Sequence, residues 1–253
     1  MSDVPKISII TVVYDAATTI DDCLRSVVSQ SYPCEHIVID GGSTDGTQQR
    51  IANYPHLATV ISEKDHGIYD AMNKGIQLAS GDIVGILNSD DFYCHDSVLA
   101  LIARVFASSR IDALFADLVY VKPDNLDKIV RYYSGADFTL AKFASGCMPP
   151  HPTFFVRREC YERYGLFKVD YRIAADFELM ARFMVQHRIN CHYLPEVIIK
   201  MRTGGVSTRS LKSNIILNQE ILRACNENGI TTNLLKIYSK YLYKCKQLIC
   251  RPK

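Results

Sequence analysis

The alternation of short apolar strands with amphipathic helices is the feature that most constrains this fold. Residues 7–14 form a β-branched apolar run, typical of a strand that is buried on both faces. Residues 20–28 place apolar side chains at helical spacing, and residues 36–40 form a second apolar strand. Since two strands joined by a helix make a βαβ unit, we expect these strands to be parallel neighbours in one sheet.

The same alternation continues to about residue 120 and then becomes irregular. It predicts an α/β layered fold, and no linker-like composition separates this layer from residues 120–205. Further strands are expected at residues 59–62, 83–87, 113–121, 128–133 and 196–202, with a loop at 143–152. Further helices are expected after the turn at 41–46 and at residues 68–79, 97–105, 159–164, 175–187, 213–228 and 233–249.

Composition narrows the class of protein. Of the 253 residues, 48% are hydrophobic and 22% are charged, which suits a sizeable core and excludes a disordered chain. The formal net charge of +2 argues against a general nucleic-acid binder. No apolar run approaches the roughly 18–20 residues that span a bilayer, and the N-terminus lacks a signal-peptide pattern. Nine cysteines without a CxxC pair indicate reduced thiols, so we expect a cytoplasmic protein.

Polar residues follow three of the predicted strands at the point where each strand ends. They are Asp15 after the first strand, Asp40 at the end of the second, and residues 88–91 after the fourth. In open α/β sheets ligands bind at this edge. The adjacent carboxylates Asp90 and Asp91 repel each other unless a cation lies nearby, and their oxygens suit Mg²⁺ or Mn²⁺ on a diphosphate. A turn or helix cap with solvated carboxylates is the alternative, and the short motif alone leaves both open.

Five short blocks follow one another over residues 9–91. They read IITVVY at 9–14 with SVVSQSY at 26–32, IVIDGGSTDGT at 37–47, DHGIYDAMNKG at 65–75, ASGD at 79–82 and LNSDD at 87–91. In this order they resemble the family 2 glycosyltransferases, most closely the bacterial enzymes that assemble O-antigen, colanic acid or capsule repeat units. The resemblance implies an α/β fold of the GT-A type, a Rossmann-like nucleotide-diphospho-sugar transferase sandwich with C-terminal helices.

The resemblance also implies a division of the chain. Residues 1–208 are expected to form the GT-A catalytic domain, with a nucleotide-sugar half at 1–120 and an acceptor half at 121–208. Residues 209–253 lie outside the match and have the pattern of a helical, basic, amphipathic tail. We therefore expect one catalytic domain followed by a separate helical segment.

Roles for donor-side residues follow from the resemblance. LNSDD occupies the place of the family's D-x-D metal motif, with Asn88 instead of the first Asp. Asp90 and Asp91 are expected to hold Mg²⁺ or Mn²⁺ against the donor diphosphate, and Asn88 to contact the donor sugar or ribose. An amide is a neutral ligand, so this departure lowers the expected metal affinity. The other implied donor contacts are Thr11, Tyr14 and Asp15 in the nucleotide pocket, Asp40 and Asp65 at the base or ribose, Ser89 beside the motif, and Lys74 at a phosphate.

On the acceptor side, Asp176 aligns with the family's catalytic base. A sugar hydroxyl is a poor nucleophile at neutral pH, so a carboxylate must take its proton as it attacks the anomeric carbon of the donor. A helix cap is the structural alternative for Asp176, and one side chain can serve both roles. His151, Arg202 and Ser207 match positions that contact the acceptor or the diphosphate, the last two in a segment that closes over the donor phosphates.

The C-terminal segment has six basic residues after position 228 and no acidic one. Its apolar side chains recur every three or four residues, the pattern of an interfacial membrane helix. A helix that packs its apolar face on the protein body has the same pattern. The basic charge and the polyprenyl-linked acceptors typical of the family favour a peripheral position on the inner face of the cytoplasmic membrane. The apolar stripe comprises Leu234, Leu235, Tyr238, Tyr241, Leu242, Cys245, Leu248 and Ile249, beside Lys236, Lys240 and Lys244.

The resemblance thus predicts an inverting glycosyltransferase, a hexosyltransferase that moves a sugar from a UDP-linked donor to a lipid-linked saccharide in bacterial surface polysaccharide biosynthesis. A sugar nucleotidylyltransferase would need a glycine-rich phosphate loop after the first strand, where residues 14–17 read YDAA. A Rossmann dehydrogenase would need G-x-G-x-x-G there, and this is absent. A non-catalytic subunit that binds nucleotide sugars is the third alternative, and the missing first Asp of D-x-D is its support.

Overall fold

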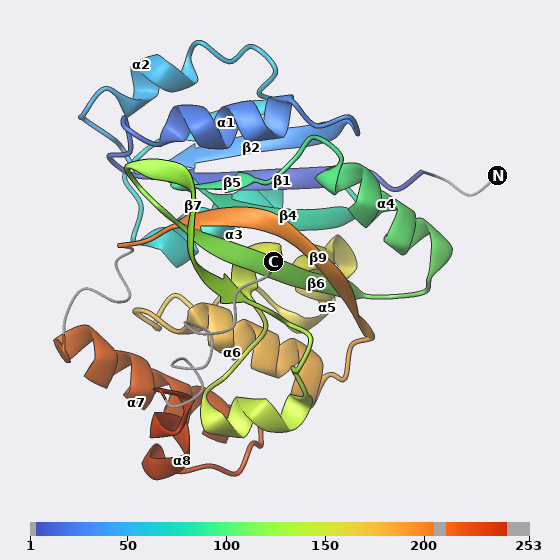
Figure 1. The fold of residues 1–253 in the computed structure, drawn as a ribbon, viewed down its shortest axis with the longest axis vertical. Helices are drawn as coiled ribbons and strands as arrows, with labels where there is room; N and C mark the ends of the chain where they lie inside the picture. Colours follow the sequence, from blue (N-terminus) through green and yellow to red (C-terminus); the bar gives the residue numbers. More distant parts are fainter. Residues whose placement is uncertain (1–3, 205–210, 242–253) are drawn as a thin grey trace.

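The computed structural model describes residues 4–204 and 211–241. They form one mixed nine-stranded sheet with helices on both faces (Figure 1). The N-terminal part contains four parallel strands in the order β3-β2-β1-β4. Their bounds are Ile7–Val13 (β1), Cys34–Asp40 (β2), Thr59–Ser62 (β3) and Ile83–Asn88 (β4). The connecting helices are Ile20–Val28 (α1), Thr47–Ile51 (α2) and Ile68–Leu78 (α3). The predicted parallel βαβ arrangement is confirmed.

The second half extends the sheet with antiparallel and parallel neighbours. Its strands are Asp91–Tyr93 (β5), Ala113–Lys122 (β6), Asn125–Tyr133 (β7), Phe155–Arg157 (β8) and Cys191–Arg202 (β9). Strand β8 lies antiparallel between β4 and β6, β9 runs parallel to β6, and β7 forms a hairpin with β6. Strands β5 and β8 were not predicted, because three residues are too few for a periodic pattern.

The helices of the second half agree with the predicted positions, with differences at their ends. They are Val98–Ser108 (α4), Arg158–Tyr164 (α5), Ala175–Ala181 (α6), Leu211–Glu227 (α7) and Leu234–Tyr238 (α8). A π-helical turn at Arg182–Gln186 (η3) continues α6. The predicted loop at 143–152 overlaps two 3₁₀ helices, Leu140–Ser145 (η1) and His151–Thr153 (η2). Strand β9 begins at Cys191, earlier than predicted, and its register with β6 shifts around Pro195, which has no N–H to donate.

Alternate strand residues supply the two larger hydrophobic cores, one on each face of the sheet. Ile9 of β1 packs in the core that includes α1 and α4, while its neighbour Ile10 packs in the core that includes α3, α6 and α7. This is the two-residue period of a strand. The core that includes α3, α6 and α7 is the larger of the two, and the acceptor half packs around it.

Helices α7 and α8 pack on the protein body (Figure 1). Ile221, Ala224 and Cys225 of α7 belong to the same core as α6, and Ile237 of α8 is fully buried beside Gly146. Leu235, in contrast, is 86% exposed. Only the start of the helix predicted at 233–249 lies within the described residues, and the rest of its stripe lies outside them. In the part of the chain that the structure describes, no helix combines the length and apolarity needed to cross a bilayer.

His36 of β2 contacts two other polar side chains, Thr11 of β1 and His56. Its Nε2 lies 3.0 Å from Thr11 Oγ1 and its Nδ1 lies 3.1 Å from His56 Nε2. Burial, helped by the nearby His56, lowers the pKa of His36 from 6.5 to about 3. The imidazole therefore stays neutral in the folded protein at pH values where the unfolded chain takes up a proton.

The lowered pKa of His36 predicts a contribution to stability that is lost in acid. As the pH falls below 6.5, His36 becomes protonated in the unfolded state but stays neutral in the folded state. The contribution of His36 to the free energy of unfolding therefore falls by about 2 kcal/mol by pH 5. We expect denaturant unfolding of the wild type to show this extra loss relative to His36→Gln, each protein being compared between pH 7.5 and pH 5. Equal losses in the two proteins would contradict the prediction.

Candidate active site

The ends of β1, β2 and β4 meet at one edge of the sheet. In the parallel register Val13 lies opposite Asp40, and Val12 lies opposite Asn88. The residues that follow each strand, including Asp15, are therefore neighbours although up to 75 positions separate them in the sequence. This edge is where open α/β sheets bind ligands.

Asp15 and Asp40 hold the loop at residues 41–46. Asp15 has a left-handed backbone (φ 47°), its N–H donates to Ser43 Oγ at 2.8 Å, and its Oδ1 accepts from Thr44 N at 2.9 Å. The buried carboxylate of Asp40 accepts from the backbone and hydroxyl of Ser43 and from two other side chains. Its visible role is thus to organise the turn, and its predicted contact with a base or ribose stays a prediction.

The aromatic ring of Tyr14 and the carboxylate of Asp65 lie on either side of Gly41. A Cβ at Gly41 would be 2.5 Å from Asp65 Oδ2 and 3.3 Å from Tyr14 Cδ2, so a larger residue would displace the Asp65 carboxylate from this position. Tyr14 is 66% exposed. An open aromatic face beside a hydrogen-bond acceptor and a bare backbone suits a flat polar ring such as a nucleobase.

Asn88, Asp90 and Asp91 form a poorly satisfied polar cluster at the end of β4. Asp91 is fully buried, and neither Asp91 Oδ1 nor Asn88 Oδ1 has a hydrogen-bond partner. Burial raises the pKa of Asp91 well above its usual range, with a further rise from the Asp90 charge, and burial also raises the pKa of Asp90. Two unpartnered acceptor oxygens among buried carboxylates fit a hard divalent cation.

Further ligands for such a cation would have to come from a substrate or water. Across residues 4–204 and 211–241, no group of three or more His, Cys, Asp or Glu side chains gathers as a metal site. Mg²⁺ is commonly held in this way, through one or two carboxylates and the phosphates of a substrate. Ser89 lies between the cluster residues in the chain and is partly buried.

Arg202 fixes the loop that carries the cluster. Its Nη1 donates to Asp90 O at 2.6 Å, its Nη2 pairs with Asp22 of α1, and its guanidinium lies 5.0 Å from the Phe92 ring centre. The side chain is 7% exposed, so its contacts are with the protein. A phosphate would have to compete with these contacts, so the predicted phosphate contact of Arg202 stays a prediction, and Ser207 lies outside the described residues.

Two other predicted donor contacts lie away from the cluster or are already paired. Thr11 is fully buried within β1, where it contacts His36, so the structure does not bring its side chain to the strand edge. The Lys74 ammonium pairs with Glu63 at 2.8 Å and with Asp70 at 3.4 Å. A phosphate would have to compete with these two carboxylates for Lys74.

Asp176 lies in the first turn of α6, close to His151 of η2. Asp176 Oδ1 accepts from Phe177 N at 2.8 Å. Burial raises the pKa of Asp176, and the nearby His151 partly offsets the rise. Burial lowers the pKa of His151, and Asp176 partly offsets that. A carboxyl group and an imidazole shifted toward each other in pKa are typical of general acid–base sites.

Two tyrosines of the β6–β7 hairpin interact electrostatically with the two carboxylate sites, Tyr120 with Asp91 and Tyr133 with Asp176. Burial and the charge of Asp91 raise the pKa of Tyr120, and burial, Tyr120 and Asp176 are among the causes that raise the pKa of Tyr133. The Arg131 guanidinium lies 4.6 Å and 5.4 Å from the two ring centres. None of these three residues was predicted from the sequence as part of the site. The aromatic-rich YVK…RYY hairpin was the available signal.

Comparisons with known proteins agree with this arrangement. The family described as glycosyl transferase family 2 matches residues 8–165. An uncharacterized glycosyltransferase of Mycobacterium tuberculosis is 33% identical over 186 residues, covering 72% of this chain and 70% of that protein. The PGL/p-HBAD biosynthesis glycosyltransferase of M. tuberculosis is 29% identical over 226 residues, covering 87% of this chain and 83% of that protein.

Solved structures share the fold at lower sequence identity. S. aureus TarS 1-349 in complex with UDP-GlcNAc has a TM-score of 0.69 at 18% identity, with 94% of this chain and 72% of that chain covered. The mannosyltransferase PcManGT from Pyrobaculum calidifontis, in complex with GDP-Man and Mn²⁺, has a TM-score of 0.66 at 22% identity, with 97% and 72% covered. The chain spans 43% of another, longer TarS chain. The predicted GT-A-type α/β fold is confirmed, and the chain belongs to glycosyltransferase family 2 and is a glycosyltransferase.

Proposed function

We propose that this glycosyltransferase moves a sugar from a nucleotide-sugar donor, UDP-linked, to the hydroxyl of a saccharide acceptor with inversion at the anomeric carbon. The observation that carries the proposal is the pair of carboxylate sites, one at the end of β4 and one at the start of α6, whose charges raise the pKa of Tyr120 and of Tyr133 respectively. One site has unpartnered buried oxygens at Asp91, and the other has Asp176 with a raised pKa. The structural neighbours that bind UDP-GlcNAc and GDP-Man support the donor class.

On the donor side, the Tyr14 ring and the Asp65 carboxylate receive the base and ribose over Gly41. Asn88, Asp90 and Asp91 would hold Mg²⁺ or Mn²⁺, whose positive charge neutralises the departing diphosphate. The Mn²⁺ in the PcManGT complex supports this choice of ion. Arg202 keeps the Asp90 backbone in place for these contacts.

On the acceptor side, Asp176 takes the proton of the attacking hydroxyl. The acceptor oxygen bonds to the anomeric carbon while the bond from that carbon to the diphosphate breaks, and the nucleoside diphosphate leaves with the electron pair. One such displacement inverts the centre. A base whose pKa lies above the usual range for Asp accepts a proton more readily near neutral pH, which suits this role.

We also propose a lipid-linked acceptor in bacterial surface polysaccharide biosynthesis and a peripheral position on the inner face of the cytoplasmic membrane. Helix α8 supports the membrane part of this proposal. Leu235, Leu234 and Tyr238 are 86%, 43% and 46% exposed, and Lys236 beside them is exposed as well. Apolar side chains with an adjacent ammonium group suit an anionic lipid surface.

Turnover with defined donors tests the proposed function. We expect nucleoside diphosphate release from one of a panel of UDP-, GDP- and dTDP-sugars with Mg²⁺ or Mn²⁺ and lipid extract, and loss of release with EDTA. Asp91→Asn should raise the metal concentration for half-maximal rate about tenfold or more, since ligating groups and their supports contribute at least this much. Asp127→Asn, at a 98% exposed carboxylate, is the matched control.

The outcomes separate the alternatives. Conversion of the nucleotide sugar and added pyrophosphate into a nucleoside triphosphate and a sugar 1-phosphate, instead of release of a nucleoside diphosphate, would indicate a nucleotidylyltransferase. Binding of a nucleotide sugar without any turnover would favour a non-catalytic subunit. NMR of the product reports whether the linkage is inverted, and a retained anomeric configuration would contradict the single displacement.

Liposome binding tests the membrane proposal. Leu235→Ser removes an exposed leucine without touching the core, and we expect about tenfold weaker binding to anionic vesicles because a buried leucine contributes about 1.5–3 kcal/mol. Leu78→Ser, at a leucine of α3 that is 42% exposed, is the matched control and should bind like the wild type. Unchanged binding of Leu235→Ser would contradict the proposal.

A further inference from the structure

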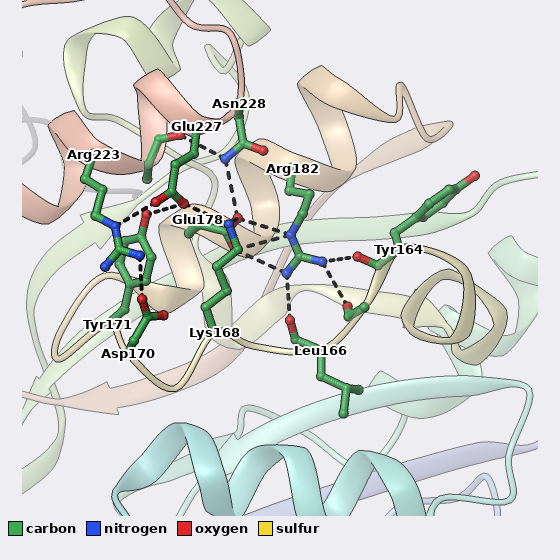
Figure 2. Close-up of polar contacts among 12 residues, drawn as sticks. Tyr164, Leu166, Lys168, Asp170, Tyr171, Glu178, Arg182, Arg223, Glu227 and Asn228 are labelled. Atoms are coloured by element: carbon green, nitrogen blue, oxygen red, sulfur yellow. Dashed lines mark hydrogen bonds and ion pairs between the residues drawn. The ribbon is translucent and has the colours of Figure 1, made fainter.

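Helix α7 presents a row of charged side chains to the segment that precedes Asp176. Glu220, Arg223 and Glu227 are spaced by three and four residues, so they share one helix face. Arg223 pairs with Asp170 at 2.5 Å, and Glu227 accepts from Lys168 at 2.8 Å and from Tyr171 at 2.9 Å, as Figure 2 shows. Residues 168–171 are thereby attached to α7.

Glu220 makes the contacts nearest to the proposed base. Its Oε1 accepts from Arg172 N at 2.7 Å, and its Oε2 accepts from Ile173 N at 2.8 Å and from Ala174 N at 2.9 Å. Ala174 is the N-cap of α6 and has no capping side chain of its own. The three N–H groups belong to the N-cap residue and the two residues before it, so a carboxylate from α7 fixes the backbone that leads into α6.

The same backbone is held from the other side by α3. Tyr69 donates its hydroxyl to Ile173 O at 2.5 Å, and its ring stacks on Phe167 at 5.7 Å. The residues just before Asp176 are therefore fixed by an acceptor from α7 and a donor from α3. A displacement of about 1 Å at a reacting group can cost a factor of 100 in rate, so such anchoring has a catalytic consequence.

We propose that Glu220 is a positioning residue for sugar transfer: its carboxylate fixes the backbone at 172–174 and so holds the Asp176 carboxylate where it meets the acceptor hydroxyl. The inference rests on the proposed role of Asp176 as base. It makes α7, which lies beyond the predicted catalytic boundary at residue 208 and beyond the family match, a working part of the acceptor site.

The pKa of Asp176 depends on the charges around it. It therefore provides a readout that a purely structural role of Glu220 would not change. His151 from η2, Glu220 from α7, Tyr69 from α3 and Tyr133 from β7 are the titratable groups that interact with it. Burial is the main cause of the raised pKa of Asp176, and the negative charge of Glu220 adds to it. Removing that charge should therefore let Asp176 ionise at a lower pH.

The experiment compares Glu220→Gln and Glu220→Ala with Glu227→Gln, a carboxylate on the same helix that contacts the same segment farther from Asp176. We expect Glu220→Ala to lower kcat about 10- to 100-fold with an unchanged donor KM. Glu220→Gln, which retains one acceptor oxygen, should lose less and should move the acid limb of the kcat profile to lower pH. Glu227→Gln should leave both kcat and the position of the acid limb of its pH profile unchanged.

Hydrogen exchange gives a second readout that does not depend on turnover. The amides of residues 172–174 should exchange faster in Glu220→Ala than in the wild type or in Glu227→Gln. Wild-type kcat in both Glu220 variants, equal effects of Glu220→Gln and Glu227→Gln, or unchanged exchange at 172–174 would overturn the inference. A wild type without turnover, or Asp176→Asn at full rate, would instead overturn the proposed function on which it rests.

Discussion

Asp176→Asn is expected to lower kcat by about 10²- to 10⁴-fold, the usual contribution of a positioned general base. The amide has nearly the shape of the carboxyl group and still offers an oxygen to Phe177 N, so the start of α6 should persist. What it loses is the ability to take the proton of the acceptor hydroxyl. Initial rates of nucleoside diphosphate release measure the loss, and calorimetry with UDP should give an unchanged Kd.

A nearby aspartate provides the control for this prediction. Asp170 lies in the segment before α6 and is 61% exposed, so Asp170→Asn removes a carboxylate without touching the proposed site. The wild-type rate should fall as the pH drops through the raised pKa of Asp176, at a higher pH than an ordinary aspartate would give. Full activity of Asp176→Asn, or a loss of the same size in Asp170→Asn, would show that the base is another group.

The donor half could be predicted because its determinants are local. Each strand of the parallel set is four or more residues long and apolar, and parallel pairing brings the strand ends to one edge. Asp90 and Asp91 therefore stood out as charges placed directly after a buried strand. Thr11 is the exception in this half. As a buried hydroxyl inside β1 it needs a partner, and its partner His36 comes from the next strand.

The acceptor half depends on contacts between distant residues, which a local pattern does not carry. Tyr120, Tyr133 and Glu220 have no motif, and each gains its meaning from a neighbour far away in the sequence. The domain boundary predicted at residue 208 followed the extent of the resemblance, and it stays a prediction. The packing of α7 on α6 and its contacts with residues 168–174 favour counting α7 with the catalytic domain.

Glu178 and Arg182 illustrate how a local pattern can mislead. Four residues apart on a predicted helix, they have the spacing of an exposed helix ion pair, which contributes only about 0.3–0.5 kcal/mol. In the structure Glu178 is fully buried and Arg182 is 8% exposed. The guanidinium also donates to the carbonyl oxygens of Tyr164, Gly165 and Leu166 (Figure 2), so it joins the start of η3 to the end of α5.

This burial makes Arg182→Met the substitution with the largest expected cost in stability. Breaking a buried ion pair by removing one partner typically costs about 3–5 kcal/mol, because the remaining charge stays buried. Lys168, 2.8 Å from Glu178 Oε1, offsets part of that charge, but the carbonyl oxygens of residues 164–166 lose their donor. We expect urea unfolding of Arg182→Met to give a free energy of unfolding lower by about this amount.

The matched control is Arg163→Met. Arg163 and Glu159 have the same spacing of four residues, but both side chains are exposed and 3.5 Å apart, so we expect a loss below about 1 kcal/mol. A double variant, Glu178→Met with Arg182→Met, should recover part of the loss because no charge is left buried. Losses of equal size at Arg163 and Arg182, or a double variant less stable than Arg182→Met, would contradict the view that the buried charge of Glu178 is what makes Arg182 indispensable.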